Sequence, residues 1–154
     1  MVSILFVCLG NICRSPCAEG VLKHFAKEDG LDLHVESCGL GDWHEGQLPD
    51  ERMRKTAQAR GIVLNSRAKG FRPEFFDVFD WILAADKSVL DELHKKTDSP
   101  AHKAKIHLMT KFSKSHLGKD VPDPYYHEIA QFEYAMDIIE DACRGISERL
   151  KKKS

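Results

Sequence analysis

The feature that most constrains the fold of this chain is an uncharged run at residues 2–7, which leads through a polar loop into an amphipathic segment. Charge-free runs of β-branched and aromatic residues are typical of strands buried on both faces of a parallel sheet. Cys8 is expected at the carboxyl end of this strand. Ser15 is the expected N-cap of the next helix, with Pro16 as its first residue and Gly30 at its end. The chain is therefore predicted to open with a strand, a loop and a helix.

Strand and helix patterns alternate along the rest of the chain. Further strands are expected at residues 33–38, 81–85 and 106–109, a helix at 49–60, and another from a cap at Asp86 or Ser88 to His94, whereas residues 71–79 look irregular. The last helix is the clearest, because its apolar residues recur every three or four positions: Ile129, Phe132, Met136, Ile139, Cys143, Ile146 and Leu150. This alternation predicts an α/β fold, a doubly wound parallel sheet in three layers with helices on both faces.

Composition limits the partners and the compartment. A chain of 154 residues that is 42% hydrophobic fits a single domain over residues 1–154. A net charge of −1 predicts neither a nucleic-acid partner nor a membrane surface. The opening apolar run is too short for a signal or membrane segment, so a cytoplasmic protein is expected. The five cysteines are expected to be reduced thiols, and the absence of HExxH or paired CxxC spacing argues against a metal site.

The loop that begins at Cys8 carries the strongest chemical signal. Ligands of parallel sheets bind at the carboxyl ends of the strands, where Cys8 is expected. A thiolate is a strong nucleophile, and the guanidinium of Arg14 forms paired hydrogen bonds to tetrahedral oxyanions. Loop amides and the following helix N-terminus would favour both an anion and the thiolate. The pattern indicates chemistry on a phosphate-like group; the alternative is a packed Cys8 and a surface Arg14.

Two distant segments closely resemble the low-molecular-weight protein tyrosine phosphatase family. The first is the phosphate-binding loop C-x5-R-S/T, formed here by Cys8, Leu9, Gly10, Asn11, Ile12, Cys13, Arg14 and Ser15. The second is the general-acid loop, matched by Asp123-Pro124-Tyr125-Tyr126. The resemblance covers nearly the whole chain. It implies a four-stranded parallel sheet, a phosphatase that needs no metal and no cofactor, and a phosphocysteine intermediate.

The resemblance also implies a role for each matched residue. Cys8 would be the nucleophile, Arg14 and the loop amides would bind phosphate, and Ser15 would hydrogen-bond the thiolate. Asp123 would be the general acid and base, although an aspartate between two prolines is often only a turn former. The aromatic rim of the cleft would comprise Trp43, Tyr125 and Tyr126, for which ordinary packing is the alternative.

Other residues have weaker or divergent matches. In the family Cys13 pairs reversibly with the nucleophile, and a packed loop thiol is the alternative here. The segment Ser66-Arg67-Ala68-Lys69 lacks a histidine that is often found there, which affects the support of the loop.

The expected substrate is a phosphotyrosine-containing protein or peptide, and the expected state is a monomer or a weakly self-associating protein. Two other functions compete with this reading. A thioredoxin-coupled arsenate reductase has a similar loop but needs resolving cysteines in the middle of the chain, where this sequence has none between Cys38 and Cys143. A phosphotyrosine-binding module without catalysis would not need the nucleophile, arginine and acid together.

Overall fold

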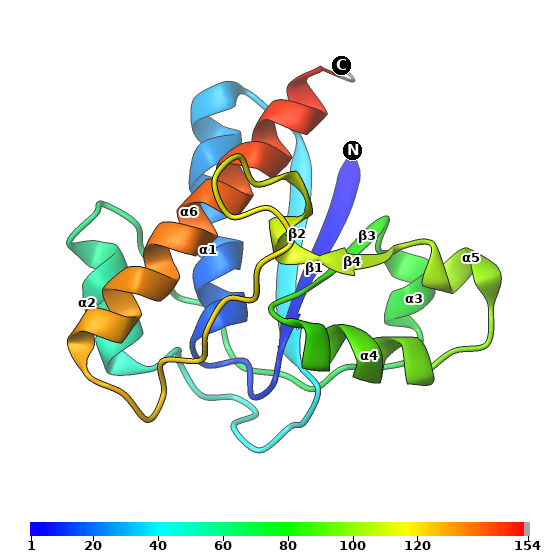
Figure 1. Ribbon diagram of the computed structural model, residues 1–154, viewed down its shortest axis with the longest axis horizontal. Helices are drawn as coiled ribbons and strands as arrows, with labels where there is room; N and C mark the ends of the chain where they lie inside the picture. The colour runs from blue at the N-terminus through cyan, green and yellow to red at the C-terminus, as the bar shows by residue number, and fades with distance from the viewer. Residues whose placement is uncertain (153–154) are drawn as a thin grey trace.

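The computed structural model describes residues 1–152, and within them a four-stranded, all-parallel sheet forms the centre of the protein (Figure 1). The strands are β1 (Val2–Cys8), β2 (Leu33–Gly39), β3 (Trp81–Ala84) and β4 (Ile106–Leu108), in the order β2-β1-β3-β4. β1 pairs with β2 on one side and with β3 on the other. The residues of β1 from Ile4 to Val7 have no exposed surface. The buried parallel strand expected at residues 2–7 is thus confirmed, and Cys8 ends it.

Helices cover both faces of the sheet, as the alternating pattern predicts. They are α1 (Arg14–Asp29), α2 (Glu51–Gln58), α3 (Phe75–Val78), α4 (Lys87–Lys95), α5 (Pro100–Lys103) and α6 (Ile129–Lys151), with a 3-10 helix η1 (Met109–Phe112) after β4. Side chains that alternate along β1 enter two cores: Ile4 and Phe6 pack with α1 and α6, and Leu5 and Val7 pack with α3 and α4. Figure 1 shows these helix pairs on opposite sides of the sheet. No helix within residues 1–152 is both long and apolar enough to cross a membrane.

The expected start of the first helix, with Ser15 as N-cap and Pro16 as first residue, is wrong by two residues. α1 begins at Arg14, and its N-cap is Cys13, which makes no side-chain capping bond. The backbone N–H of Cys17 already donates to the carbonyl of Cys13 at 3.2 Å, so Ser15 lies inside the helix, and its hydroxyl contacts the Cys8 sulfur at 2.8 Å instead of capping a helix amide. The expected end is confirmed, since Gly30 is the C-cap with φ 67°. That left-handed conformation favours glycine.

Other boundaries differ for local reasons. α2 is shorter than the expected 49–60, because the carboxylate of Asp50 caps it and the chain turns at Gly61, with φ 80°. The segment expected to be irregular contains the single turn α3, which packs Phe76 into the core. In α6 the periodic residues are buried except Ile129, which is 53% exposed at the first position of the helix.

Candidate active site

The loop between β1 and α1 is held in shape by Asn11. Its φ of 61° is a left-handed conformation, which asparagine tolerates better than most residues. Its backbone N–H donates to Cys8 Sγ at 3.3 Å, and its Nδ2 donates to the hydroxyls of Ser15 at 2.7 Å and Ser37 at 3.0 Å. Its Oδ1 accepts from the backbone N–H of Lys69 at 3.0 Å. The segment Ser66-Arg67-Ala68-Lys69, which lacks the histidine expected from the resemblance, therefore supports the loop through the backbone N–H of Lys69.

Arg14 is almost completely buried, and its guanidinium is fixed from behind. Its Nη1 donates to Asp86 Oδ2 at 2.6 Å and to the carbonyl of Val121 at 2.9 Å. Its Nη2 lies 4.0 Å from Asp123 Oδ2. Burial alone would lower the pKa of Arg14, but Cys8 and the facing carboxylates raise it on balance, so Arg14 is a permanent cation. Asp86, expected only as a helix cap, is a partner of this arginine that the sequence did not indicate.

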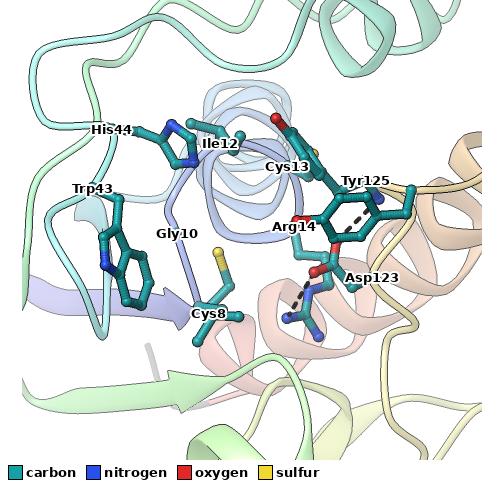
Figure 2. Close-up of a pocket in the computed structure, with 11 residues that line it drawn as sticks. Cys8, Gly10, Ile12, Cys13, Arg14, Trp43, His44, Asp123 and Tyr125 are labelled. Carbon is teal, nitrogen blue, oxygen red and sulfur yellow. Dashed lines mark hydrogen bonds and ion pairs between the residues drawn. The ribbon is translucent and has the colours of Figure 1, made fainter.

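Cys8, Arg14 and Asp123 line one cleft of about 250 Å³. Figure 2 shows the Cys8 sulfur, the Arg14 guanidinium and the Asp123 carboxylate directed toward the same space. The remaining lining residues are Leu9, Gly10, Ile12, Cys13, Trp43, His44, Tyr125 and Tyr126. Asn11 and Ser15 lie behind the loop, 2% and 0% exposed. The structure thus brings the predicted residues together, with the nucleophile candidate at the carboxyl end of the central strand.

Aromatic residues form the rim of the cleft. Trp43 is 66% exposed and Tyr126 88%, which is unlike ordinary core packing. The Trp43 ring lies so close to Gly41 that a Cβ there would be 2.5 Å from it, so glycine permits this placement. The rings of Tyr125 and Tyr126 meet edge to face, with their centroids 4.8 Å apart. The ring centroid of His44 lies 6.3 Å from that of Tyr125. His44 was not predicted; its only sequence signal is its place beside Trp43 in a glycine-rich loop.

Asp123 sits at a turn as well as at the cleft. Its Oδ1 accepts from the backbone N–H of Tyr125 at 3.1 Å, and its Oδ2 is the oxygen that faces Arg14. Turn formation and a chemical role are therefore compatible, because each uses a different carboxylate oxygen.

Cys13 is a buried thiol beside the cleft. Burial raises its pKa, and the nearby Asp50 and Cys8 raise it further, so the thiol stays protonated. All five cysteines, which lie within the described residues, are free thiols. Reversible pairing of Cys13 with Cys8 stays a prediction.

Comparison with known proteins identifies the family. The family model "Low molecular weight phosphotyrosine protein phosphatase" matches residues 3–154. A putative low molecular weight protein-tyrosine-phosphatase from Synechocystis, slr0328, is 36% identical, over 98% of both chains. The crystal structure of a protein tyrosine phosphatase from Entamoeba histolytica superposes with a TM-score of 0.94 at 37% identity, over 99% of both chains.

A more distant solved structure, the YwlE arginine phosphatase, has a TM-score of 0.89 at 25% identity, over 98% of this chain and 97% of the other. The sequence matches extend over nearly the full length of the chain, and the structural matches reproduce its four-stranded parallel sheet and flanking helices. The chain therefore belongs to the low molecular weight phosphotyrosine protein phosphatase family and is a phosphatase enzyme.

Proposed function

We propose that this phosphatase hydrolyses phosphotyrosine in proteins or peptides, and small aryl phosphates, through a phosphocysteine intermediate on Cys8. The observation that carries the proposal is that Cys8, Arg14 and Asp123 share one cleft with an aromatic rim. A thiolate, a buried cation and a carboxylic acid are the three groups that an in-line displacement on a phosphate monoester uses.

In the first step the Cys8 thiolate attacks phosphorus, forming an S–P bond as the bond from phosphorus to the phenolic oxygen breaks. Both hydrogens of Arg14 Nη1 are used by Asp86 and Val121, so the Nε–Nη2 edge is the pair of donors that holds the equatorial oxygens. Protonated Asp123 gives its proton to the departing phenolate. General acid catalysis of this kind contributes about 10²–10⁴ in rate.

In the second step water attacks the phosphocysteine, and Asp123, now ionised, takes the water's proton. The S–P bond breaks, inorganic phosphate leaves and the Cys8 thiolate returns. The Ser15 hydroxyl, 2.8 Å from Sγ, and the Asn11 N–H, 3.3 Å from it, both donate to the sulfur as negative charge develops there. These two bonds make Cys8 a better leaving group.

The rim supports an aryl substrate. Trp43, Tyr125 and Tyr126 offer flat apolar surfaces that suit a phenol ring, and aromatic pairs contribute about 0.5–1.5 kcal/mol beyond the burial of their area. Because one related structure is named as an arginine phosphatase, phosphoarginine is a necessary comparison substrate.

The test is turnover of p-nitrophenyl phosphate, a phosphotyrosine peptide, a phosphoserine peptide and free phosphoarginine, with and without EDTA. We expect the two aryl phosphates to be preferred, EDTA to have no effect, and Cys8→Ser to abolish turnover. Preference for phosphoarginine would overturn the substrate assignment, and undiminished activity of Cys8→Ser would overturn the mechanism. No turnover by the unaltered protein would favour a binding module, and arsenate reduction with thioredoxin would favour a reductase.

Asp123→Asn tests the acid. We expect it to slow p-nitrophenyl phosphate turnover at least about tenfold while inhibition by inorganic phosphate is retained. The matched control is Glu128→Gln, an exposed acid that follows the same segment and makes no side-chain capping bond to α6, which we expect to leave turnover nearly unchanged. Equal loss of phosphate binding in Asp123→Asn would show that the residue is structural.

A further inference from the structure

We propose that Arg52 is a positioning residue that ties the segment carrying Asp123 to the N-terminal end of α2, and so keeps the proton donor beside the Cys8 loop. The inference rests on the proposed function of Asp123. Arg52 lies outside the cleft lining and was not indicated by any sequence motif.

The start of α2 is attached to the Cys8 loop. The backbone N–H of Asp50, the N-cap of α2, donates to the carbonyl of Ile12 at 2.7 Å. The Asp50 carboxylate accepts from the backbone N–H of Arg52 at 2.8 Å, which is the capping bond of the helix. This end of α2 is therefore held in a fixed position relative to the phosphate-binding loop.

Asp50 also orients the guanidinium of Arg52. Arg52 Nε donates to Oδ1 at 3.1 Å and Nη2 donates to Oδ2 at 3.0 Å, the paired geometry that is strong and directional between arginine and a carboxylate. On its other side the guanidinium carbon lies 4.6 Å from the ring centroid of Phe132, a core residue of α6. Carboxylate and ring together restrict the group to one orientation.

The remaining hydrogens of the fork reach the Asp123 segment. Nη2 donates to the carbonyl of Tyr125 at 2.8 Å and Nη1 donates to the carbonyl of His127 at 3.3 Å. The N–H of the same Tyr125 donates to Asp123 Oδ1 at 3.1 Å. Arg52 thus fixes the Tyr125 backbone, and that backbone fixes the carboxylate.

The segment needs such a tie because it has no helix or strand of its own. Residues 119–126 lie between η1 and α6 without regular structure. Val121 is bonded through its N–H to the carbonyl of Ala85 at 2.8 Å, which anchors the segment before Asp123. The two bonds from Arg52 anchor it after Asp123. A proton donor anchored on both sides is held near its working geometry, and small displacements of such groups are costly to catalysis.

The expected signature is a loss that depends on the leaving group. Phenolate is strongly basic and needs its proton in the transition state, whereas 2,4-dinitrophenolate is a weak base and departs without one. We expect Arg52→Ala to lower kcat/KM for phenyl phosphate about tenfold and for 2,4-dinitrophenyl phosphate less than about twofold. The matched control is Arg54→Ala on the same helix, whose Nε donates to the carbonyl of Pro49; both substrates should be unaffected.

Two further measurements separate positioning from folding and from charge. Inhibition of Arg52→Ala by inorganic phosphate should equal that of the unaltered enzyme; weakened inhibition with equal loss on both substrates would show that Arg52 supports the phosphate loop and would overturn the inference. Arg52→Lys keeps the charge but not the fork, so it should remain close to Arg52→Ala. Full recovery with lysine would mean that charge alone matters, which also overturns the inference.

Asp123→Asn is run beside these variants. If it shows the leaving-group-dependent loss and Arg52→Ala does not, the inference fails while the proposed function stands. If Asp123→Asn leaves kcat/KM for phenyl phosphate unchanged, Asp123 is not the proton donor and the proposed function of this residue is wrong.

Discussion

The two carboxylate oxygens of Asp86 bind two different partners, the start of α4 and the guanidinium of Arg14. Oδ1 accepts from the backbone N–H of Val89 at 2.8 Å and caps α4. Oδ2 lies 2.6 Å from Nη1 of the buried Arg14. The cap was predicted because aspartate is common at that position, but the ion pair joins residues 72 positions apart and has no local pattern. The role of Arg52 could not be predicted for the same reason, because its bond to the carbonyl of Tyr125 joins residues 73 positions apart.

The substitution Asp86→Asn distinguishes the capping of α4 from the ion pair with Arg14. Asparagine caps a helix as well as aspartate does, but its bond to Arg14 has only one charged partner. We expect the free energy of unfolding to fall by about 1 kcal/mol and kcat/KM to fall about tenfold for phenyl and 2,4-dinitrophenyl phosphate alike, because Arg14 serves phosphate rather than the leaving group. Urea denaturation and steady-state kinetics measure both effects.

The control for Asp86→Asn is Ser88→Ala, the other cap candidate, which is exposed and should change neither quantity. If Asp86→Asn lowered kcat/KM for phenyl phosphate more than for 2,4-dinitrophenyl phosphate, Asp86 would support the proton donor rather than Arg14.

In α6, the apolar periodicity predicts the helix and its buried face but not the elements that the helix crosses. The apolar spacing predicted a long amphipathic helix, and the helix Ile129–Lys151 is present with its stripe buried. The apolar spacing gives no reason for Gly145 within this helix, where glycine is a poor helix former. In the structure Gly145 is where α6 crosses the end of η1, and a Cβ there would lie 1.9 Å from the carbonyl oxygen of Phe112. The close crossing depends on a second element whose position no local pattern predicts.

Gly145→Ala is therefore expected to destabilise the protein, although alanine favours a helix over glycine by about 1 kcal/mol. The backbone of Phe112 cannot move aside as a side chain does, so we expect a net loss of at least about 2 kcal/mol in the free energy of unfolding. Urea denaturation measures it. Gly20→Ala in α1 is the matched comparison: its Cβ would meet a terminal methyl of the buried Leu64 side chain at 2.4 Å, and a methyl can shift where a backbone carbonyl cannot, so the loss should be clearly smaller. Equal effects of the two substitutions would contradict the account.

For the whole molecule, the order of strand and helix patterns was sufficient to predict the layered parallel sheet, because alternation leaves few ways to bury each strand. The site was predicted in outline for the same reason: Cys8 ends the central strand, and the carboxyl edge of a parallel sheet is where loops converge. The long segments outside regular structure were not predictable in this way. The loop after η1, for example, is attached to α6 through Asp141, which accepts from the backbone N–H of Ser115 at 3.0 Å and faces His116 Nδ1 at 2.8 Å.

This attachment gives the fold a dependence on pH. Burial alone would raise the pKa of Asp141, but the bonds from His116 and Ser115 lower it on balance below its ordinary 3.8. A carboxyl with a lowered pKa binds fewer protons in the folded state than in the unfolded state. Its contribution to stability is therefore complete above the unfolded pKa of about 4 and is lost as the pH falls through the folded value.

Asp141→Asn should reduce the free energy of unfolding by about 1.5 kcal/mol at pH 7, since a charged acceptor is replaced by a neutral one. The difference from the unaltered protein should persist at pH 5 and narrow as the pH falls below about 4, because the native carboxyl then becomes neutral too. Urea denaturation across this range measures the difference. Other carboxyls with lowered pKa values, Asp29, Glu36 and Asp50, titrate in both proteins and cancel. Glu148→Gln, an exposed change on the same helix, should show no such narrowing, and a pH-independent difference for Asp141→Asn would mean that its charge does not hold the loop.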